Sequence, residues 1–110
     1  MTREELFEKG DRMCHEGSRP EGMKLIMQAA EMGHPRAMEM VGEEALHGHD
    51  GAPDYEKSYE WSLKAAQAGQ VRALTNLGVL NLYGQGCKQN ASRAMEYLKE
   101  AYEKIGRAHV

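Results

Sequence analysis

The chain has 110 residues, enough for one domain with a modest core. With 41% hydrophobic and 28% charged residues it is predicted to be globular, and its formal charge of -3 lacks the basic excess typical of nucleic-acid or membrane-surface binding. No apolar run approaches the roughly 20 residues of a membrane span, and the charged start is not a secretory signal. For a chain that is whole rather than cut from a longer protein, these features predict a cytoplasmic location with no membrane or nucleic-acid partner.

Helical spacing of apolar residues predicts six helices in chain order. They fall at about 3–16, 19–33, 36–48, 54–69, 72–84 and 91–105. Pro20 suits the first turn of the second helix, and Gly33 ends that helix. Asp54 and Asn90 are predicted to cap the fourth and sixth helices, and Gly69 to stop the fourth. No segment predicts a strand, so we expect an all-α fold.

A repeat relates these helices to one another. Trp61 lies 36 residues after Leu25 and 36 before Tyr97, and Gly42 lies 36 residues before Gly78. Coincidences at one spacing along the whole chain indicate tandem structural units. The sequence is therefore predicted to form a single domain of three helix-turn-helix repeats, at about 3–35, 36–71 and 72–107.

Each predicted first helix contains a glycine, at Gly10, Gly42 and Gly78. Glycine costs a helix interior roughly 1 kcal/mol relative to alanine, so we expect a compensating role. Without a Cβ atom, the neighbouring helix can pack against the backbone. Repeated close helix pairs predict an αα-solenoid, a right-handed superhelix of stacked pairs.

The third repeat carries the most specific pattern. Its features are Leu77-Gly78, the Gly84-x-Gly86 turn, Arg93-Ala94, Tyr97 and Ala101. The middle repeat matches at Ala37, Gly42, Gly48, Asp54-Tyr55-Glu56-Lys57, Trp61, Lys64-Ala65-Ala66 and Gly69, and the first repeat matches least. This pattern resembles the Sel-one-like repeat, a relative of the tetratricopeptide repeat, over nearly the whole chain. The resemblance implies a scaffold or adaptor that binds a protein or peptide partner, with no cofactor and no enzymatic activity.

The sequence departs from the pattern of that family in two places. The family usually has an aromatic residue three positions after the first-helix glycine, where this sequence has Met13, Ala45 and Asn81. Ile105 takes the place of the final glycine of the third repeat, and Gly106 follows. The segment from residue 107 to 110 then looks like the start of a fourth repeat, so either the chain was cut there or the last helix is a cap.

By analogy with tetratricopeptide repeats, the resemblance implies a concave groove lined by the first helices. The groove positions lie three residues before each glycine and one, four and five residues after it. Cys14, four residues after Gly10, occupies one of these positions. The predicted partner-binding residues are Phe7, Asp11, His15, Glu39, Glu43, Leu46, His47, Thr75, Val79, Leu82 and Tyr83. One end of this surface is mixed and acidic and the other is apolar. We expect it to suit an amphipathic helix or extended peptide with apolar anchors and some basic charge.

Several of these residues have a second interpretation as core. Leu46, Val79 and Leu82 are core residues if the helical phase is displaced by one position, and the second interpretation of Phe7 is a cap on the N-terminal end of the core. The methionines, such as Met23, either fill the core or form an adaptable binding face. A different alternative is a homo-oligomer, in which the last helix docks on a second copy through Tyr97, Leu98 and Tyr102.

The sequence offers residue types suited to metal binding and nucleophilic catalysis, but none stands in a recognisable motif. Cys14, His15 and His47, together with His49 and Asp50 in the following turn, offer metal-ligand types but match no zinc motif. Cys14 and His15 are consecutive on a helix and point about 100° apart, which does not suit a nucleophile and its base. Two cysteines 73 residues apart are too few for a disulfide scaffold, so Cys14 and Cys87 are predicted to be free thiols. We therefore predict no metal site and no catalytic residue.

Overall fold

A computed structural model describes residues 1–48 and 51–108, and side chains as far as residue 106. Within these ranges the chain forms six helices and no strand. The helices are α1 (Arg3–His15), α2 (Arg19–Glu31), α3 (Pro35–His47), α4 (Tyr55–Gln67), α5 (Val71–Tyr83) and α6 (Ala91–Ala108). The predicted all-α class is confirmed, and most helix ends fall within one or two residues of their predicted positions.

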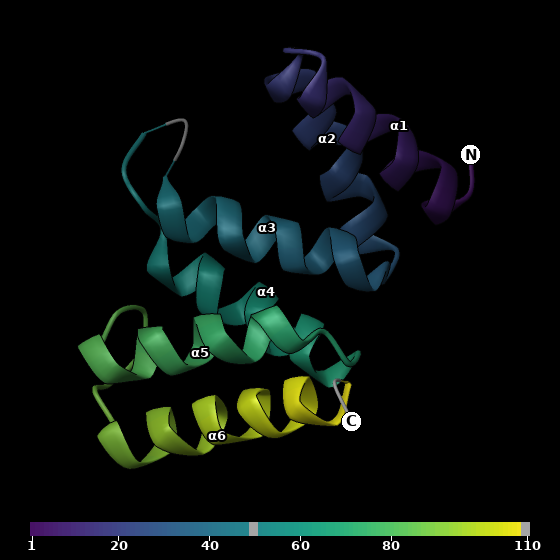
Figure 1. Cartoon of the computed structure of the whole chain (residues 1–110). Helices are drawn as coiled ribbons and strands as arrows, with labels where there is room; N and C mark the ends of the chain where they lie inside the picture. The colour runs from purple at the N-terminus through teal and green to yellow at the C-terminus, as the bar shows by residue number, and fades with distance from the viewer. Residues whose placement is uncertain (49–50, 109–110) are drawn as a thin grey trace.

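The helices pack as three successive pairs. α1 packs on α2, α3 on α4 and α5 on α6, while α2–α3 and α4–α5 contacts join each pair to the next. Figure 1 shows the pairs stacked from top to bottom, with α4 running behind α3 and α5. The first helices α3 and α5 also touch each other directly. The chain is an all-α solenoid, as predicted.

Side chains cap the helices at their N-termini. The Asp54 carboxylate accepts the backbone N–H of Lys57 at 3.1 Å, and the Asn90 side chain accepts that of Arg93 at 2.9 Å. Both caps were predicted from the sequence. Two further caps were not predicted. The Thr2 hydroxyl accepts the N–H of Glu5 at the start of α1, and the Nδ1 atom of His34 accepts the N–H of Ala37 at the start of α3.

Glycines bring the paired helices together, as predicted. A Cβ atom added at Gly10 would lie 2.7 Å from the carbonyl oxygen of Gly22 on α2. One added at Gly42 would lie 2.7 Å from the Ser62 hydroxyl, and one at Gly78 would lie 2.7 Å from the Leu98 side chain. Real Cβ atoms essentially never approach so closely. The propensity lost at these positions is therefore offset by direct packing between helices.

The C-terminal end of α6 differs from the prediction. The helix was expected to stop near residue 105, but it continues to Ala108. Gly33 and Gly69 leave their helices with φ angles of 84° and 93°, a conformation that costs glycine little. Ile105 occupies the equivalent position, where its Cβ atom disfavours a positive φ, so the helix continues through Gly106.

Candidate protein-binding surface

The predicted groove residues divide into three groups by exposure. Those exposed are His15, His47, Thr75 and Tyr83, those half-buried are Asp11, Glu43, Leu46, Val79 and Leu82, and those buried are Phe7 and Glu39. Cys14 is also half-buried. The first helices therefore present most of the predicted positions at or near the surface, and two of them do not reach it.

Phe7 belongs to the core and not to an open surface. Its side chain is 5% exposed, and its ring stacks on His34 with centroids 4.4 Å apart. The guanidinium of Arg36 lies over the same ring, 5.2 Å from its centroid. Phe7 is thus covered by the start of α3, which leaves little of the ring for a partner. This is the second of the two interpretations that the sequence left open.

Glu39 is the second buried position, at 8% exposure. Burial raises the pKa of this carboxyl above its ordinary value, and the nearby Glu43 raises it further, while Arg72 and Arg36 act in the opposite direction. A buried carboxyl that costs energy to ionise is a poor contact for a partner. We therefore leave Phe7 and Glu39 out of the candidate surface.

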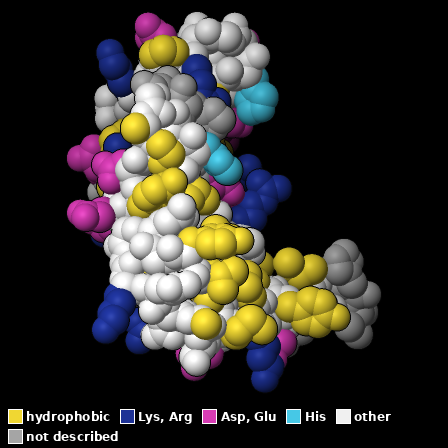
Figure 2. All heavy atoms as spheres, turned by 90° about the vertical axis from the view of Figure 1, so that its left-hand side faces the viewer, with side chains coloured by type: hydrophobic (Ala, Val, Ile, Leu, Met, Phe, Trp, Pro, Cys, Tyr) yellow, Lys and Arg dark blue, Asp and Glu magenta, His cyan; other side chains and the backbone are white. Residues whose placement is uncertain are grey.

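The remaining residues include an apolar patch near the C-terminal end of α5. Tyr83 is 66% exposed there, and Val79 and Leu82 on the same helix are half-buried. Leu46 holds the equivalent half-buried place on α3. Figure 2 shows the end of the molecule where α3 and α5 finish, and hydrophobic side chains gather in the lower half of this view. Exposed aromatic rings beside aliphatic side chains are typical of protein interfaces.

Sequence reasoning missed Asn76 on α5. Its side chain is half-buried, and its Nδ2 atom is buried with no hydrogen-bond partner among the residues described. It lies between Thr75 and Val79 on the first helix of the third repeat. A buried donor without a partner costs roughly 1–3 kcal/mol, which makes it notable beside a candidate interface. The only signal in the sequence is a polar residue in an otherwise apolar helix.

The thiols do not have the environment of nucleophiles. Burial raises the pKa of both the Cys14 and the Cys87 thiol above the ordinary value. Each sulfur faces a backbone carbonyl oxygen, Cys14 that of Arg19 at 3.9 Å and Cys87 that of Leu80 at 3.6 Å. Reactive cysteines need a lowered pKa, so these two are structural. Both are free, as the sequence predicts.

The metal-ligand types do not assemble where the chain is described. Within residues 1–48 and 51–106, no three His, Cys, Asp or Glu side chains are placed to hold a metal ion. The ring of His15 turns toward its own helix, where Nδ1 lies 2.8 Å from the carbonyl oxygen of Asp11. His49 and Asp50 lie outside the described residues.

Two segments of the chain, residues 35–70 and 71–104, match the family model of the Sel1 repeat. Together they cover more than half of the chain. The chain belongs to the Sel1 repeat family. The first helix pair precedes both matching segments, and it packs on the Sel1 repeats through α2 and α3.

Solved structures of Sel1 repeat proteins share this fold. A Sel1 repeat protein from Oxalobacter formigenes superposes with a TM-score of 0.80 and 26% identity, over 90% of this chain and 42% of that one. The protein c5321, a protective antigen present in uropathogenic Escherichia coli strains, superposes with a TM-score of 0.84 and 26% identity, over 93% of this chain and 23% of that one.

Curated relatives extend the likeness to animal proteins. Protein sel-1 homolog 2 of Mus musculus is 29% identical over 98 residues, and that of Homo sapiens is 26% identical over 98 residues. Each alignment covers 86% of this chain and 14% of the relative, so the chain spans about 14% of their length.

Sel1 repeat proteins generally mediate protein–protein interactions and form a non-catalytic family of interaction scaffolds. The repeats therefore favour a protein partner. In the described part of the chain, no helix is both long enough and apolar enough to cross a membrane.

Proposed function

We propose that this Sel1 repeat chain is an adaptor that holds a peptide or protein segment on the surface formed by α3 and α5. The observation that carries the proposal is Tyr83, whose ring is 66% exposed beside the half-buried Leu82 and Val79. Leaving this apolar area in water costs free energy that a partner would recover by covering it. Aromatic side chains of this kind often contribute most of the energy of an interface.

The charge on this face defines the partner further. Glu43 lies half-buried on α3 with the exposed His47 four residues later, and Asp11 and His15 hold the equivalent places on α1, the first helix of the preceding pair. Carboxylates at one end and apolar side chains at the other match a segment with apolar anchors and a basic flank. The unpartnered amide of Asn76 supplies a further polar contact once its side chain rotates toward the partner's backbone. We place the adaptor in the cytoplasm, as the sequence predicts.

The proposal is tested by capturing partners from a native lysate with two variants of this chain. The Leu82→Glu/Tyr83→Ala variant alters the apolar patch. Tyr102→Ala is the matched control, because Tyr102 is 77% exposed on α6 and is not part of the candidate surface. Circular dichroism and thermal unfolding establish that each variant is folded, and mass spectrometry identifies what each captures.

We expect a specific partner to be retained by the wild-type chain and by Tyr102→Ala, and to be lost by the double variant. Truncating one well-packed aromatic anchor costs roughly 2 kcal/mol or more, a loss of over tenfold in affinity. Equal capture by all three chains would mean that the binding surface lies elsewhere. If the double variant unfolds, capture is compared with the single Tyr83→Ala variant. That variant should stay folded, because the Tyr83 side chain is mostly exposed in the wild-type chain.

Self-association is a second candidate, favoured by exposed apolar side chains on α6. Met95 is 62%, Tyr102 77% and Ile105 49% exposed. Of the three residues that the sequence offered for this role, Tyr97 and Leu98 are half-buried within the chain, and only Tyr102 is exposed. A sedimentation-equilibrium mass that rises toward two chains with concentration, and stays at one chain for Tyr102→Ala, would support it. A mass of one chain throughout would exclude it.

A further inference from the structure

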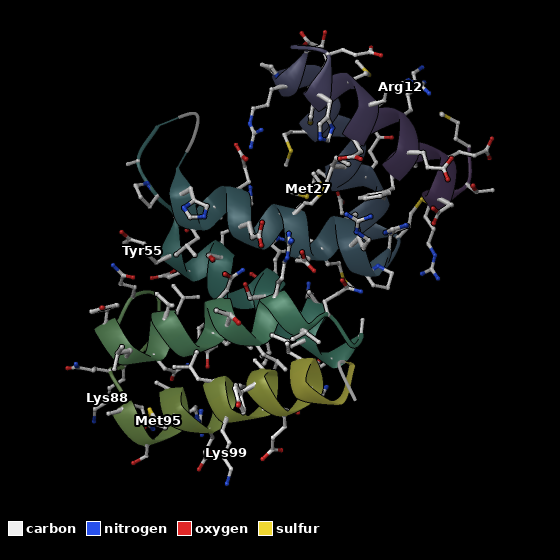
Figure 3. The ribbon with its side chains drawn as sticks, viewed as in Figure 1. Arg12, Met27, Tyr55, Lys88, Met95 and Lys99 are labelled. Atoms are coloured by element: carbon white, nitrogen blue, oxygen red, sulfur yellow. The ribbon has the colours of Figure 1, made fainter. Side chains whose placement is uncertain are left out.

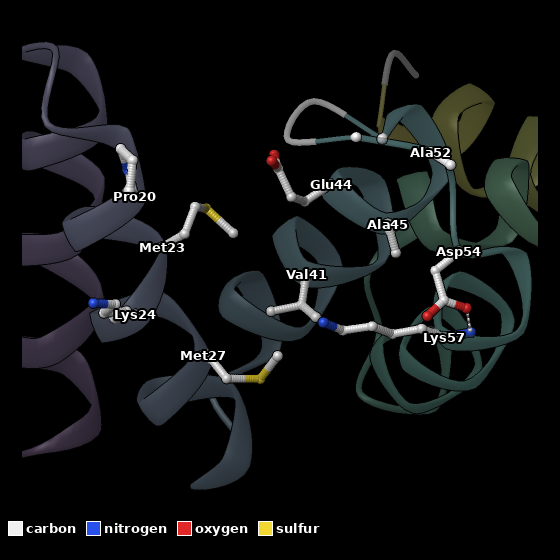
Figure 4. A pocket seen from close by; sticks show the side chains of 12 residues that line it. Pro20, Met23, Lys24, Met27, Val41, Glu44, Ala45, Ala52, Asp54 and Lys57 are labelled. Carbon is white, nitrogen blue, oxygen red and sulfur yellow. Dashed lines mark hydrogen bonds between the residues drawn. The ribbon is translucent and has the colours of Figure 1, made fainter.

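A groove opens between the first and second helix pairs, and its lining shares no residue with the surface proposed above. α2 and the start of α4 form its walls, and α3 forms its floor. Its volume is about 450 Å³, within the range of ligand pockets in proteins. Met23 and Met27 on one wall face Val41 and Ala45 on the floor (Figure 4). Figure 3 shows Met27 in this space, between the first pair and α3.

The groove exists because the two junctions between repeats are built differently. At the second junction, Leu80 is fully buried and Tyr59 is half-buried. The equivalent residues at the first junction are Glu44 and Met23. An ion pair between Glu44 and Arg19 holds α2 and α3 together there, and the space beside it stays open. The corresponding hollow at the second junction is smaller, about 310 Å³, and Tyr59 lines it.

The acidic groups in the groove are already engaged. Glu44 accepts a hydrogen bond from Arg19 through Oε2, and Asp54 accepts the backbone N–H of Lys57. The two lysines are not engaged. Lys24 and Lys57 are exposed on opposite walls, and neither makes an ion pair with any residue that the structure describes. Asp54 keeps its own negative charge, so with Glu44 paired to Arg19 the two lysines leave the groove with one net positive charge.

One acceptor in the groove also lacks a partner. The Oε1 atom of Glu44 is buried and accepts no hydrogen bond within the described part of the chain. An occupant that suits the groove brings apolar side chains for the methionine wall, a carboxylate for the lysines and an N–H donor that Oε1 accepts once the Glu44 side chain turns into the groove. A peptide with an acidic residue beside an apolar one supplies all three, whereas a fatty acid lacks the donor.

We propose that the groove between α2, α3 and α4 binds a peptide segment of a partner protein in which Asp or Glu adjoins an apolar residue. The apolar side chain lies between Met27 and Val41, and its acidic neighbour pairs with Lys24 or Lys57. In Figure 4 the side chain of Lys57 reaches from α4 toward the wall that carries Lys24. Methionine side chains adapt readily to different apolar anchors, which suits a groove that accepts a class of sequences. The groove does not depend on the surface around Tyr83.

The experiment selects binders from a phage-displayed library of short random peptides, using the whole chain as bait. Selected peptides are then measured against Lys24→Glu/Lys57→Glu and against Lys88→Glu/Lys99→Glu. The second variant makes the same change in net charge at exposed lysines outside the groove. Thermal unfolding shows that both variants remain folded, and Leu82→Glu/Tyr83→Ala reports separately on the other surface.

The proposal predicts enriched peptides with an acidic residue next to an apolar one. Their affinity should fall by about tenfold on Lys24→Glu/Lys57→Glu, because attraction at both lysines becomes repulsion. It should change little on Lys88→Glu/Lys99→Glu or on Leu82→Glu/Tyr83→Ala. The proposal is overturned if no peptide is enriched, if the enriched peptides lack acidic residues, or if both lysine variants weaken them equally. Loss of binding only on Leu82→Glu/Tyr83→Ala would also overturn it, while supporting the surface on α3 and α5.

Discussion

The imidazole of His34 lies against the phenyl ring of Phe7, with centroids 4.4 Å apart and ring planes inclined by 14°. His34 is 5% exposed, and its Nε2 atom is 2.7 Å from a carboxylate oxygen of Glu4. Its Nδ1 atom caps α3. Through this one side chain the start of α3 is tied to α1, so Phe7 helps to hold the first helix pair on the second.

Phe7→Ala is therefore expected to destabilise the fold rather than remove a binding contact. Truncating a buried phenylalanine costs about 3–5 kcal/mol, a large fraction of the stability of so small a domain. Tyr83→Ala should change stability by no more than about 0.5 kcal/mol, because that ring is mostly exposed. Urea unfolding followed by circular dichroism measures both. A Phe7→Ala chain as stable as the wild type would return Phe7 to the candidate surface.

Ser58 and Ser62 provide a matched pair on α4. Both are fully buried, but the Ser58 hydroxyl donates to the carbonyl oxygen of Gly42 at 2.8 Å, whereas Ser62 Oγ has no partner among the described residues. Ser58→Ala should cost about 1 kcal/mol, and Ser62→Ala should be neutral or stabilising. Thermal or urea unfolding compares them. Equal losses for the two variants would contradict the hydrogen-bond assignment.

The helix-packing glycines differ in what opposes a new methyl group. In Gly10→Ala the Cβ atom meets the backbone carbonyl oxygen of Gly22, which cannot move without shifting α2. In Gly78→Ala it meets the side chain of Leu98, which can change rotamer. Gly10→Ala should lose about 1–3 kcal/mol, and Gly78→Ala less, since part of its strain is relieved. Urea unfolding measures the stability of both variants. A larger loss for Gly78→Ala than for Gly10→Ala would contradict this account.

Glu39 makes the stability of the fold depend on pH. Its pKa is raised by burial, so the folded chain binds this proton more tightly than the unfolded chain does. The stability associated with that proton is present at low pH and is lost as the pH rises through the raised value. Glu39→Gln should therefore raise the unfolding midpoint at about pH 7 and bring no such gain at about pH 3.5, below the ordinary carboxyl pKa. Glu103→Gln, at an exposed site on α6, should leave the unfolding midpoint unchanged at both pH values.

The fold could be predicted because its determinants are local and repeat. Gly42 and Gly78 stand 36 residues apart, and Trp61 stands 36 residues from both Leu25 and Tyr97. Asp54 and Asn90 cap their helices by accepting the backbone N–H of the residue three positions later. Such signals survive without knowledge of the tertiary structure. The end of α6 was predicted wrongly because Gly106 stands one residue late for the turn that Gly33 and Gly69 make.

The candidate sites depended on contacts between residues far apart in sequence. Phe7 occupies a groove position by its spacing from Gly10, but His34, on another helix pair, covers it. The groove at the first junction lies beside an ion pair between Arg19 and Glu44, which are 25 residues apart, and the sequence around either residue does not predict the other as its partner. Asn76 became notable only when its buried amide was found without a partner.

The central claim is that partners bind the face formed by α3 and α5 around Tyr83. The most direct measurement is hydrogen exchange by mass spectrometry on this chain, alone and saturated with a partner captured from lysate. We predict that exchange slows in α3 and α5, strongest near Val79 and Tyr83, and that Tyr83→Ala removes the effect while Tyr102→Ala preserves it. Slowing confined to α4 and α6, or unchanged in Tyr83→Ala, would contradict the claim.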